Sequence, residues 1–230
     1  MKYQLSDYFT LVFDCDGVVL DSNRVKTEAF YQATLPFGEA AAQAMVDYHV
    51  ANGGVSRYKK FAYFLAQIAP ESAAVQQVPD LKALLHAFAS HVRKGVLNCE
   101  IAPGLEALRQ RTPNARWLIV SGGDQDELRD VFSRRGIAKW FDGGIFGSPD
   151  TKEAILQREL TSGNMQRPAL FLGDSRYDYN VANEFELDFL FVNGWSEFED
   201  WQHWVDEMSL DHVSSIRHVM ETESFRRRGA

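Results

Sequence analysis

Two short apolar runs, far apart in the chain, each lead into a pair of acidic residues. Leu-Val-Phe precedes Asp14 and Asp16, and Ala-Leu-Phe-Leu precedes Asp174 and Asp178. Short runs of aliphatic and aromatic residues are typical of buried strands. In a parallel α/β sheet the carboxyl ends of the strands meet at one edge, where ligands bind. The sequence therefore predicts an α/β fold whose parallel sheet gathers these carboxylates at one edge.

Carboxylates that meet at one edge would repel one another strongly unless a cation lies between them. Mg²⁺ is the natural candidate, because it accepts a few carboxylates and leaves coordination positions for water and phosphate. The segment around Asp14, taken alone, is equally typical of an acidic surface turn, and the second acidic segment is what favours a metal site. The sequence therefore predicts a Mg²⁺ site built by residues that follow two strands.

Two further segments supply groups that suit a phosphoryl group. One apolar run ends in Ser121 and Gly122, and Lys152 opens a helical pattern after another such run. The Ser121 hydroxyl and nearby backbone N–H groups can donate hydrogen bonds to phosphate oxygens, and the Lys152 ammonium can neutralise their charge. Each segment alone is more typical of a turn or of a solvated lysine. Their value as a prediction comes from their combination with the acidic segments.

Taken in this order, the four segments resemble the haloacid dehalogenase superfamily, most closely its phosphatase and phosphomutase branch with a helical (C1-type) cap. Val19 stands where many relatives have threonine, a change that removes no charge and no ligand. The resemblance implies a Rossmann-like parallel sheet core, residues 1–21 and 99–230, with an inserted α-helical cap, residues 22–98. The residues that carry it are Phe13-Asp14-Cys15-Asp16-Gly17-Val18 with Asp21-Ser22, then Ser121, then Lys152, then Gly173-Asp174-Ser175 with Asp178.

The resemblance also implies catalytic roles. Asp14 would be the nucleophile that forms an aspartyl phosphate, and Asp16 would be the general acid and base. Ser121, Gly122 and Lys152 would bind the phosphoryl group. The presence of Asp16 argues against the dehalogenase branch, whose carbon chemistry lacks this second acid.

The metal ligands implied by the resemblance come from both acidic segments. Mg²⁺ would be held by the Asp14 carboxylate, the Asp16 backbone carbonyl and Asp174. Asp178 would be a further ligand or would orient metal-bound water. The Asp16 carboxylate has to stay off the metal, because a coordinated carboxylate could not exchange protons with the substrate.

One segment of the expected cap, residues 52–61, combines glycines with basic residues. Ser56 is a candidate N-cap for the helix that follows. Helix N-termini favour anions, and Arg57 lies in the first turn of this helix. The segment therefore resembles the substrate-specificity loop of helical caps, in which Arg57 would contact the phosphate or the leaving group. An equally good interpretation makes Arg57, Lys59 and Lys60 a solvated basic turn.

These observations predict a Mg²⁺-dependent phosphatase that acts on a small phosphorylated metabolite, with a sugar phosphate or polyol phosphate favoured. The first alternative is a phosphomutase of the β-phosphoglucomutase type, which uses the same motifs. A phosphonatase would need a cap lysine that forms an imine, for which Lys59 or Lys60 is available. A receiver-like phospho-aspartate switch is a further alternative of another class, although such modules have no large helical insert.

Composition is that of an ordinary globular enzyme. The chain has 230 residues, 45% of them hydrophobic, and a formal net charge of −8. The charge disfavours nucleic acid as a partner. The absence of a long apolar run or a signal-peptide pattern predicts a cytoplasmic protein without membrane contact. Cys15 and Cys99 suggest neither a disulfide nor a zinc site, and the oligomeric state is not predicted.

Local signals also predict where several elements begin and end. Asp124 is expected to be the N-cap of a helix that stops near Gly136. Residues 189–192 are expected to form a further parallel strand, and a helix is expected around residues 213–225.

Overall fold

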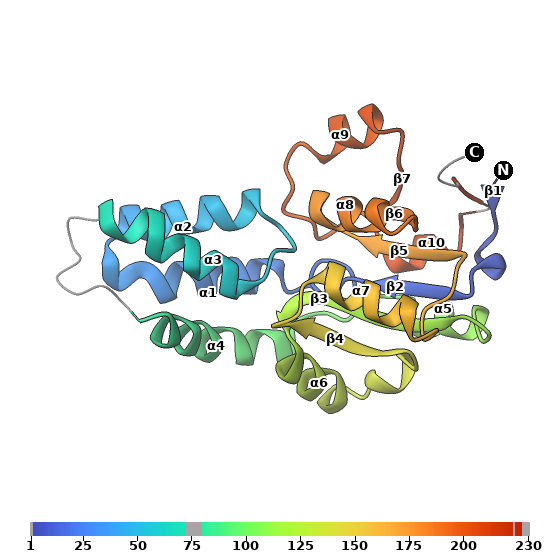
Figure 1. Ribbon diagram of the computed structural model, residues 1–230, viewed down its shortest axis with the longest axis horizontal. Coiled ribbons are helices and arrows are strands. Elements are labelled where there is room, and N and C mark those ends of the chain that lie inside the picture. Colours follow the sequence, from blue (N-terminus) through green and yellow to red (C-terminus); the bar gives the residue numbers. More distant parts are fainter. Residues whose placement is uncertain (1, 72–79, 223, 227–230) are drawn as a thin grey trace.

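The core of the protein is a six-stranded sheet whose neighbouring strands are all parallel (Figure 1). The computed structural model describes residues 2–71, 80–222 and 224–226. The strand order is β4-β3-β2-β5-β6-β7, which places β2 at the centre. The strands are β2 (Thr10–Phe13), β3 (Arg116–Asp124), β4 (Gly144–Ser148), β5 (Ala169–Gly173), β6 (Asp188–Val192) and β7 (Asp211–Val213).

Helices cover both faces of this sheet. On one face Val12 and Phe171 pack with the helices α7, α8 and α9. On the other face Leu11 and Phe13 pack with α5, α6 and α10. The central strand is therefore buried on both sides, which explains its continuous apolar sequence. These helices are α5 (Leu105–Arg111), α6 (Gln125–Arg134), α7 (Lys152–Thr161), α8 (Arg176–Glu184), α9 (Trp201–Glu207) and α10 (Ile216–Val219).

A helical cap is inserted between β2 and α5 and lies beside the carboxyl edge of the sheet (Figure 1). Its centre is a cluster of aromatic rings, in which the Phe30 ring lies 5.1 Å from that of Phe61 and 4.4 Å from that of Phe88. The cap helices are α1 (Asn23–Thr34), α2 (Glu39–Ala51), α3 (Arg57–Tyr63) and α4 (Leu81–Asn98). This arrangement confirms the predicted α/β fold with a Rossmann-like sheet and a helical insert.

Helix-capping side chains define where the core helices on the side of the cap domain begin. The Asp124 carboxylate accepts hydrogen bonds from the first turn of α6, and Thr151 and Ser175 cap α7 and α8 in the same way. Ser56 caps α3. The predicted caps Asp124 and Ser56 are therefore confirmed, and the helix N-termini of the core point to the carboxyl edge of the sheet.

The carboxyl-terminal segment differs from the sequence-based expectation. A helix around residues 213–225 is wrong, because residues Asp211–Val213 form β7 against β6 and α10 has only four residues. A two-stranded antiparallel sheet then joins β1 (Lys2–Tyr3) to β8 (Phe225–Arg226). The buried residues Val213, Ile216 and Val219 recur every third position, so a strand, a bend and one helical turn imitate the spacing of a longer helix.

Candidate active site

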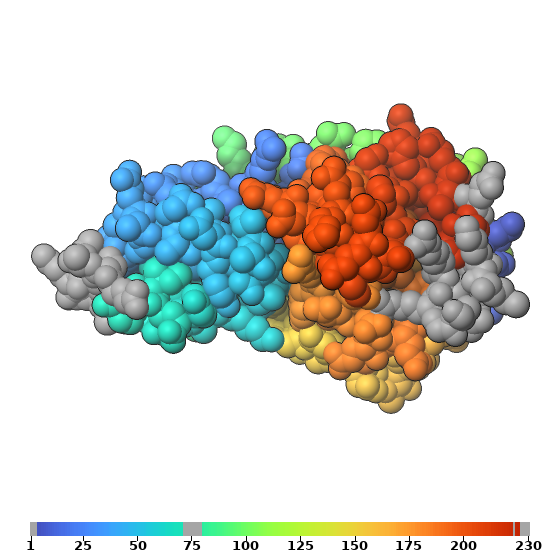
Figure 2. Space-filling view, turned by 90° about the horizontal axis from the view of Figure 1, so that it is seen from above, coloured from blue at the N-terminus to red at the C-terminus, as the bar shows by residue number. Residues whose placement is uncertain are grey.

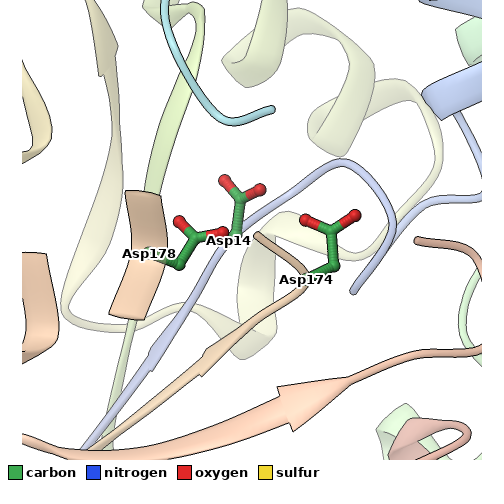
Figure 3. Close-up of side chains that lie close together, drawn as sticks. All are labelled: Asp14, Asp174 and Asp178. Atoms are coloured by element: carbon green, nitrogen blue, oxygen red, sulfur yellow. The ribbon is translucent and has the colours of Figure 1, made fainter. Parts of the chain in front are cut away.

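Three buried carboxylates lie together where β2 and β5 end (Figure 3). Asp14 follows β2, Asp174 follows the neighbouring strand β5, and Asp178 lies in the first turn of α8. Each offers an oxygen, and these oxygens lie within 4.8 Å of one another. The two acidic segments of the sequence therefore meet, and their hard oxygen donors are of the kind that a divalent cation prefers.

Lys152 supplies positive charge to this cluster from the N-terminus of α7. Its Nζ donates to Oδ1 of Asp14 at 2.8 Å and to Oδ1 of Asp178 at 2.5 Å. The side chain is only 1% exposed. Burial alone would lower the pKa of Lys152, but the charges of Asp14 and Asp178 raise it above its usual range. Lys152 is therefore a fixed ammonium between the carboxylates.

The acidic cluster carries more negative charge than one lysine can compensate. Burial raises the pKa of Asp14 to about 7, with the charge of Asp178 acting in the same direction against that of Lys152. Burial, with the charges of Asp14 and Asp178, also raises the pKa of Asp174 well above its usual range. A further cation beside these two carboxylates would lower their pKa values and favour their ionised forms. The cluster therefore has the excess of negative charge that favours binding of a metal ion.

Asp16 lies apart from the three clustered carboxylates. Its carboxylate accepts a 2.5 Å hydrogen bond from the Ser22 hydroxyl and forms an ion pair with Lys26 of α1. Burial raises the pKa of Asp16, but the Lys26 charge and the hydrogen bonds from Lys26 and Ser22 outweigh this effect and lower the pKa below its usual value. The Asp16 carboxylate is therefore held in its ionised form by Lys26 and Ser22, outside the acidic cluster.

Cys15 lies between Asp14 and Asp16 in sequence but faces the interior. It is fully buried. Burial and the charge of Asp16 raise the pKa of its thiol well above the ordinary value, although Lys26 opposes them. A thiolate nucleophile is therefore excluded at this position.

Ser121 and Gly122 lie at the end of β3, the strand next to β2. The Ser121 hydroxyl accepts a hydrogen bond from the Gly123 N–H at 3.0 Å. Gly122 is in close contact with the cap, because a Cβ at this position would collide with the backbone of Gly54. The absence of a side chain at Gly122 is therefore what lets the cap loop approach the sheet.

Arg57 connects the cap to the core. Its guanidinium lies 2.9 Å from Glu127 and 3.4 Å from Asp124, both at the start of α6. The hydroxyl of Tyr58 donates to the same Asp124 carboxylate at 2.8 Å. Arg57 is buried, and its Nε has no hydrogen-bond partner among the described residues.

The interpretation of this segment as a solvated basic turn is wrong for Arg57 and Lys60, which are 7% and 1% exposed. Lys59 is exposed, as that interpretation requires. Arg57 lines the cavity described next, and its contact with substrate stays a prediction.

A cavity of about 1400 Å³ separates the cap from the core. Small-molecule sites commonly have volumes of about 300–1,000 Å³, so a metabolite of several carbon atoms fits easily. Figure 2 shows the cap beside the segment that follows β6. The Thr27 hydroxyl of the cap donates a 2.7 Å hydrogen bond to Glu197 of that segment. The residues that line the cavity include Asp14, Asp16, Lys26, His49, Arg57, Lys60, Gly122 and Asp174.

Two contacts at this site had no signal in the sequence. Lys26, which lies in α1 ten residues after Asp16, forms an ion pair with the Asp16 carboxylate. Asn23 donates to Asp174 at 2.7 Å and to the Trp195 carbonyl at 2.9 Å. Both residues belong to α1, and their positions become meaningful only when the cap has folded against the core.

The family follows from comparison with known proteins. The model of the haloacid dehalogenase-like hydrolase family matches residues 9–185. The chain therefore belongs to the haloacid dehalogenase-like hydrolases. No match is found among curated proteins.

Several solved structures have the same fold. A predicted phosphoglycolate phosphatase from Haemophilus somnus has a TM-score of 0.71 at 14% identity, with 94% of this chain and 97% of that chain covered. A predicted phosphatase from Clostridium acetobutylicum has a TM-score of 0.69 at 15% identity, with 93% and 97% covered. β-Phosphoglucomutase from Clostridium difficile has a TM-score of 0.66 at 16% identity, with 91% and 92% covered. At these identities the likeness concerns the fold.

Within residues 2–71, 80–222 and 224–226, every helix is too short or too polar to cross a bilayer.

Proposed function

We propose that this protein is a Mg²⁺-dependent phosphatase that hydrolyses a small phosphomonoester through an aspartyl phosphate. The observation that carries the proposal is the position of Asp14. Its buried carboxylate is in contact with Lys152 and clustered with Asp174 and Asp178, while a second acid, Asp16, follows two residues later outside the cluster. One carboxylate is thus suited to attack phosphorus, and the other lies outside the acidic cluster, where it can serve as the acid and base.

In the proposed reaction an Asp14 oxygen forms a bond to phosphorus while the bond from phosphorus to the leaving oxygen breaks. Asp16, which must first bind a proton because Lys26 and Ser22 lower its pKa, gives that proton to the leaving oxygen. It then takes a proton from the water that attacks the aspartyl phosphate, which returns Asp14 as a free carboxylate and yields inorganic phosphate. Lys152 holds a fixed positive charge against the Asp14 carboxylate throughout.

The donor set fits a magnesium ion, with Asp14, the Asp16 backbone carbonyl and Asp174 as the residues that would hold it and Asp178 next to them. All are oxygen donors, and the clustered carboxylates have an excess of negative charge. When bound, Mg²⁺ would supply charge neutralisation for the carboxylates and for the phosphoryl oxygens.

A phosphate-release screen over phosphorylated metabolites tests the proposal. We expect release from at least one sugar phosphate, polyol phosphate or related monoester with Mg²⁺ present, and a fall to background after chelation with EDTA that added Mg²⁺ reverses. The screen should also include glucose 1-phosphate with a bisphosphate activator, followed by product analysis. Isomerisation with little inorganic phosphate would instead support the phosphomutase alternative. Release that is insensitive to EDTA would contradict the metal assignment.

We also propose that Arg57 contributes to substrate binding through the position of the cap loop. Replacing Arg57 with alanine removes two ion pairs between cap and core and one cationic group from the cavity wall. We expect kcat/KM for the best substrate to fall about tenfold or more, as for the loss of a hydrogen bond to a charged group. Lys59→Ala, which removes an exposed neighbouring charge, is the matched control. Equal kcat/KM in Arg57→Ala and wild type would show that Arg57 has no role in turnover.

A further inference from the structure

The wall of the cavity contains a buried ammonium, that of Lys60, which has no role in the proposed mechanism. It lies in α3 of the cap and is 1% exposed. Its Nζ lies 2.6 Å from Nδ1 of His49 and donates to the His49 carbonyl at 3.3 Å. Phe30 lies on its apolar side, with the ring centroid 5.6 Å from Nζ.

His49 orients Lys60 without compensating its charge. Burial, together with the charges of Lys60 and Lys26, lowers the pKa of His49 well below its usual range. The imidazole is therefore neutral, and its Nδ1 accepts the hydrogen bond. An ammonium has three N–H donors. The ring nitrogen and the carbonyl of His49 use two of them, which leaves one for another partner.

Three other cap cations line the cavity, Lys26, Arg57 and Arg93, of which Arg93 is exposed to solvent and the other two have carboxylate partners. Lys26 pairs with Asp16, and Arg57 pairs with Glu127 and Asp124. Among the described residues, no carboxylate lies within ion-pair distance of Lys60. Lysine is almost never fully buried without a partner, because desolvation of an unpaired charge is costly. Burial and the charge of Lys26 lower the pKa of Lys60 to about 7, although the more distant charges of Asp16, Glu197 and Asp174 oppose this shift.

We propose that Lys60 binds a carboxylate on the leaving group, so that the substrate is a phosphorylated hydroxy acid rather than a neutral polyol phosphate. This inference rests on the proposed function and specifies its substrate class. Lys60 lines the same cavity of about 1400 Å³ as Asp14 and Asp16, which places the ammonium and the two acids in one binding space. The carboxylate takes no part in bond breaking and leaves on the product alcohol.

Pairs of substrates that differ only in the carboxylate test this inference. One pair is 3-phosphoglycerate and glycerol 3-phosphate, and a longer pair is 6-phosphogluconate and glucitol 6-phosphate. Lys60→Met keeps the length of the side chain and removes its charge. We expect wild type to prefer the acid in at least one pair by about tenfold to a hundredfold in kcat/KM. Lys60→Met should lose that preference, so that its kcat/KM values for the acid and the neutral member lie within about threefold of each other.

The control for local disturbance is Lys59→Met, at the exposed neighbouring position, which should retain the preference. The melting temperature of Lys60→Met should equal or exceed that of wild type, because the variant removes an unpaired buried charge. Should Lys60→Met fail to fold, Lys60→Gln replaces it with the same expectations.

Three results would overturn the inference. The first is equal use of acid and neutral members in both pairs, and the second is an acid preference that survives in Lys60→Met. The third is borohydride trapping of a carbonyl substrate on Lys60, which would make this residue an imine-forming lysine. In each of these cases, hydrolysis of the neutral phosphates would still support the proposed phosphatase activity, and only the role of Lys60 would be refuted.

A binding measurement separates failure of this inference from failure of the proposed function. Asp14→Asn lacks the proposed nucleophile, so 3-phosphoglycerate and 6-phosphogluconate can be titrated into it by calorimetry without turnover. Adding Lys60→Met to this variant should weaken the affinity for at least one acid about tenfold or more. Unchanged affinity for both acids would overturn the role of Lys60, whether or not any phosphate is hydrolysed by wild type.

Discussion

Replacing Asp14 with asparagine is expected to lower phosphate release by at least about a thousandfold, because removal of a covalent nucleophile leaves only binding and electrostatic effects. The amide has nearly the same shape, so the fold should persist. It can still accept the hydrogen bond from Lys152, which lies 2.8 Å from the present carboxylate oxygen. The measurement is single-turnover phosphate release with Mg²⁺, accompanied by circular dichroism and a melting curve.

The matched control for that experiment is Asp150→Asn. Asp150 lies two residues before the start of α7. Its exposed carboxylate forms an ion pair with the exposed Arg158. This variant should retain the activity of wild type. A folded Asp14→Asn protein with normal turnover would refute the nucleophile assignment and with it the proposed reaction.

Replacing Lys152 with methionine is expected to cause the largest loss of stability of any single change in the site. Lys152 is 1% exposed and is in contact with both Asp14 and Asp178. Removing one partner of a buried ion pair typically costs about 3–5 kcal/mol, because the remaining charge is left buried without compensation. We expect a clear fall in the melting temperature and in the midpoint of urea denaturation, together with loss of phosphate release.

The pH dependence of that destabilisation has a definite sign. The pKa of Asp14 is about 7 in the folded protein, above its unfolded value, so the folded state binds more protons and loses stability as pH rises towards 7. Without the Lys152 ammonium this folded pKa should rise further. The Lys152→Met variant should therefore be closer to wild type at pH 5 than at pH 8, and added Mg²⁺ should recover part of its stability at pH 8.

Lys139→Met provides the corresponding control, because Lys139 is exposed and lies over the ring of Trp140 instead of in an acidic cluster. Its stability should remain within about 0.5 kcal/mol of wild type. Equal stability of Lys152→Met and Lys139→Met at pH 8 would mean that the buried ion pairs contribute nothing to the folded state.

The parts of the fold that the sequence predicts are those set by local physical rules. Apolar runs that lead into Asp14 and Asp174 predict that these acids lie at the same edge of a parallel sheet, because carboxyl ends of such strands share an edge. Asp124 predicts a helix start because its short carboxylate accepts hydrogen bonds from the first helical turn. Such signals lie within a few residues of the element that they define.

The features that could not be predicted depend on contacts between distant segments. The pairing of Lys26 with Asp16 requires the position of α1 relative to the sheet, and the burial of Lys60 requires packing of α3 against α2. The expected helix near the carboxyl terminus is wrong because β6 offers an unpaired edge to Asp211–Val213, and strand pairing outweighs local helical spacing there.

The buried thiol beside the nucleophile has a consequence for regulation. Cys15 is the immediate neighbour of Asp14, yet it has no exposed surface and its thiol stays protonated. Oxidants and alkylating reagents attack the thiolate, and they need access to it. The thiol beside the nucleophile is therefore shielded from peroxide and from alkylating reagents, so inhibition through modification of Cys15 is not expected.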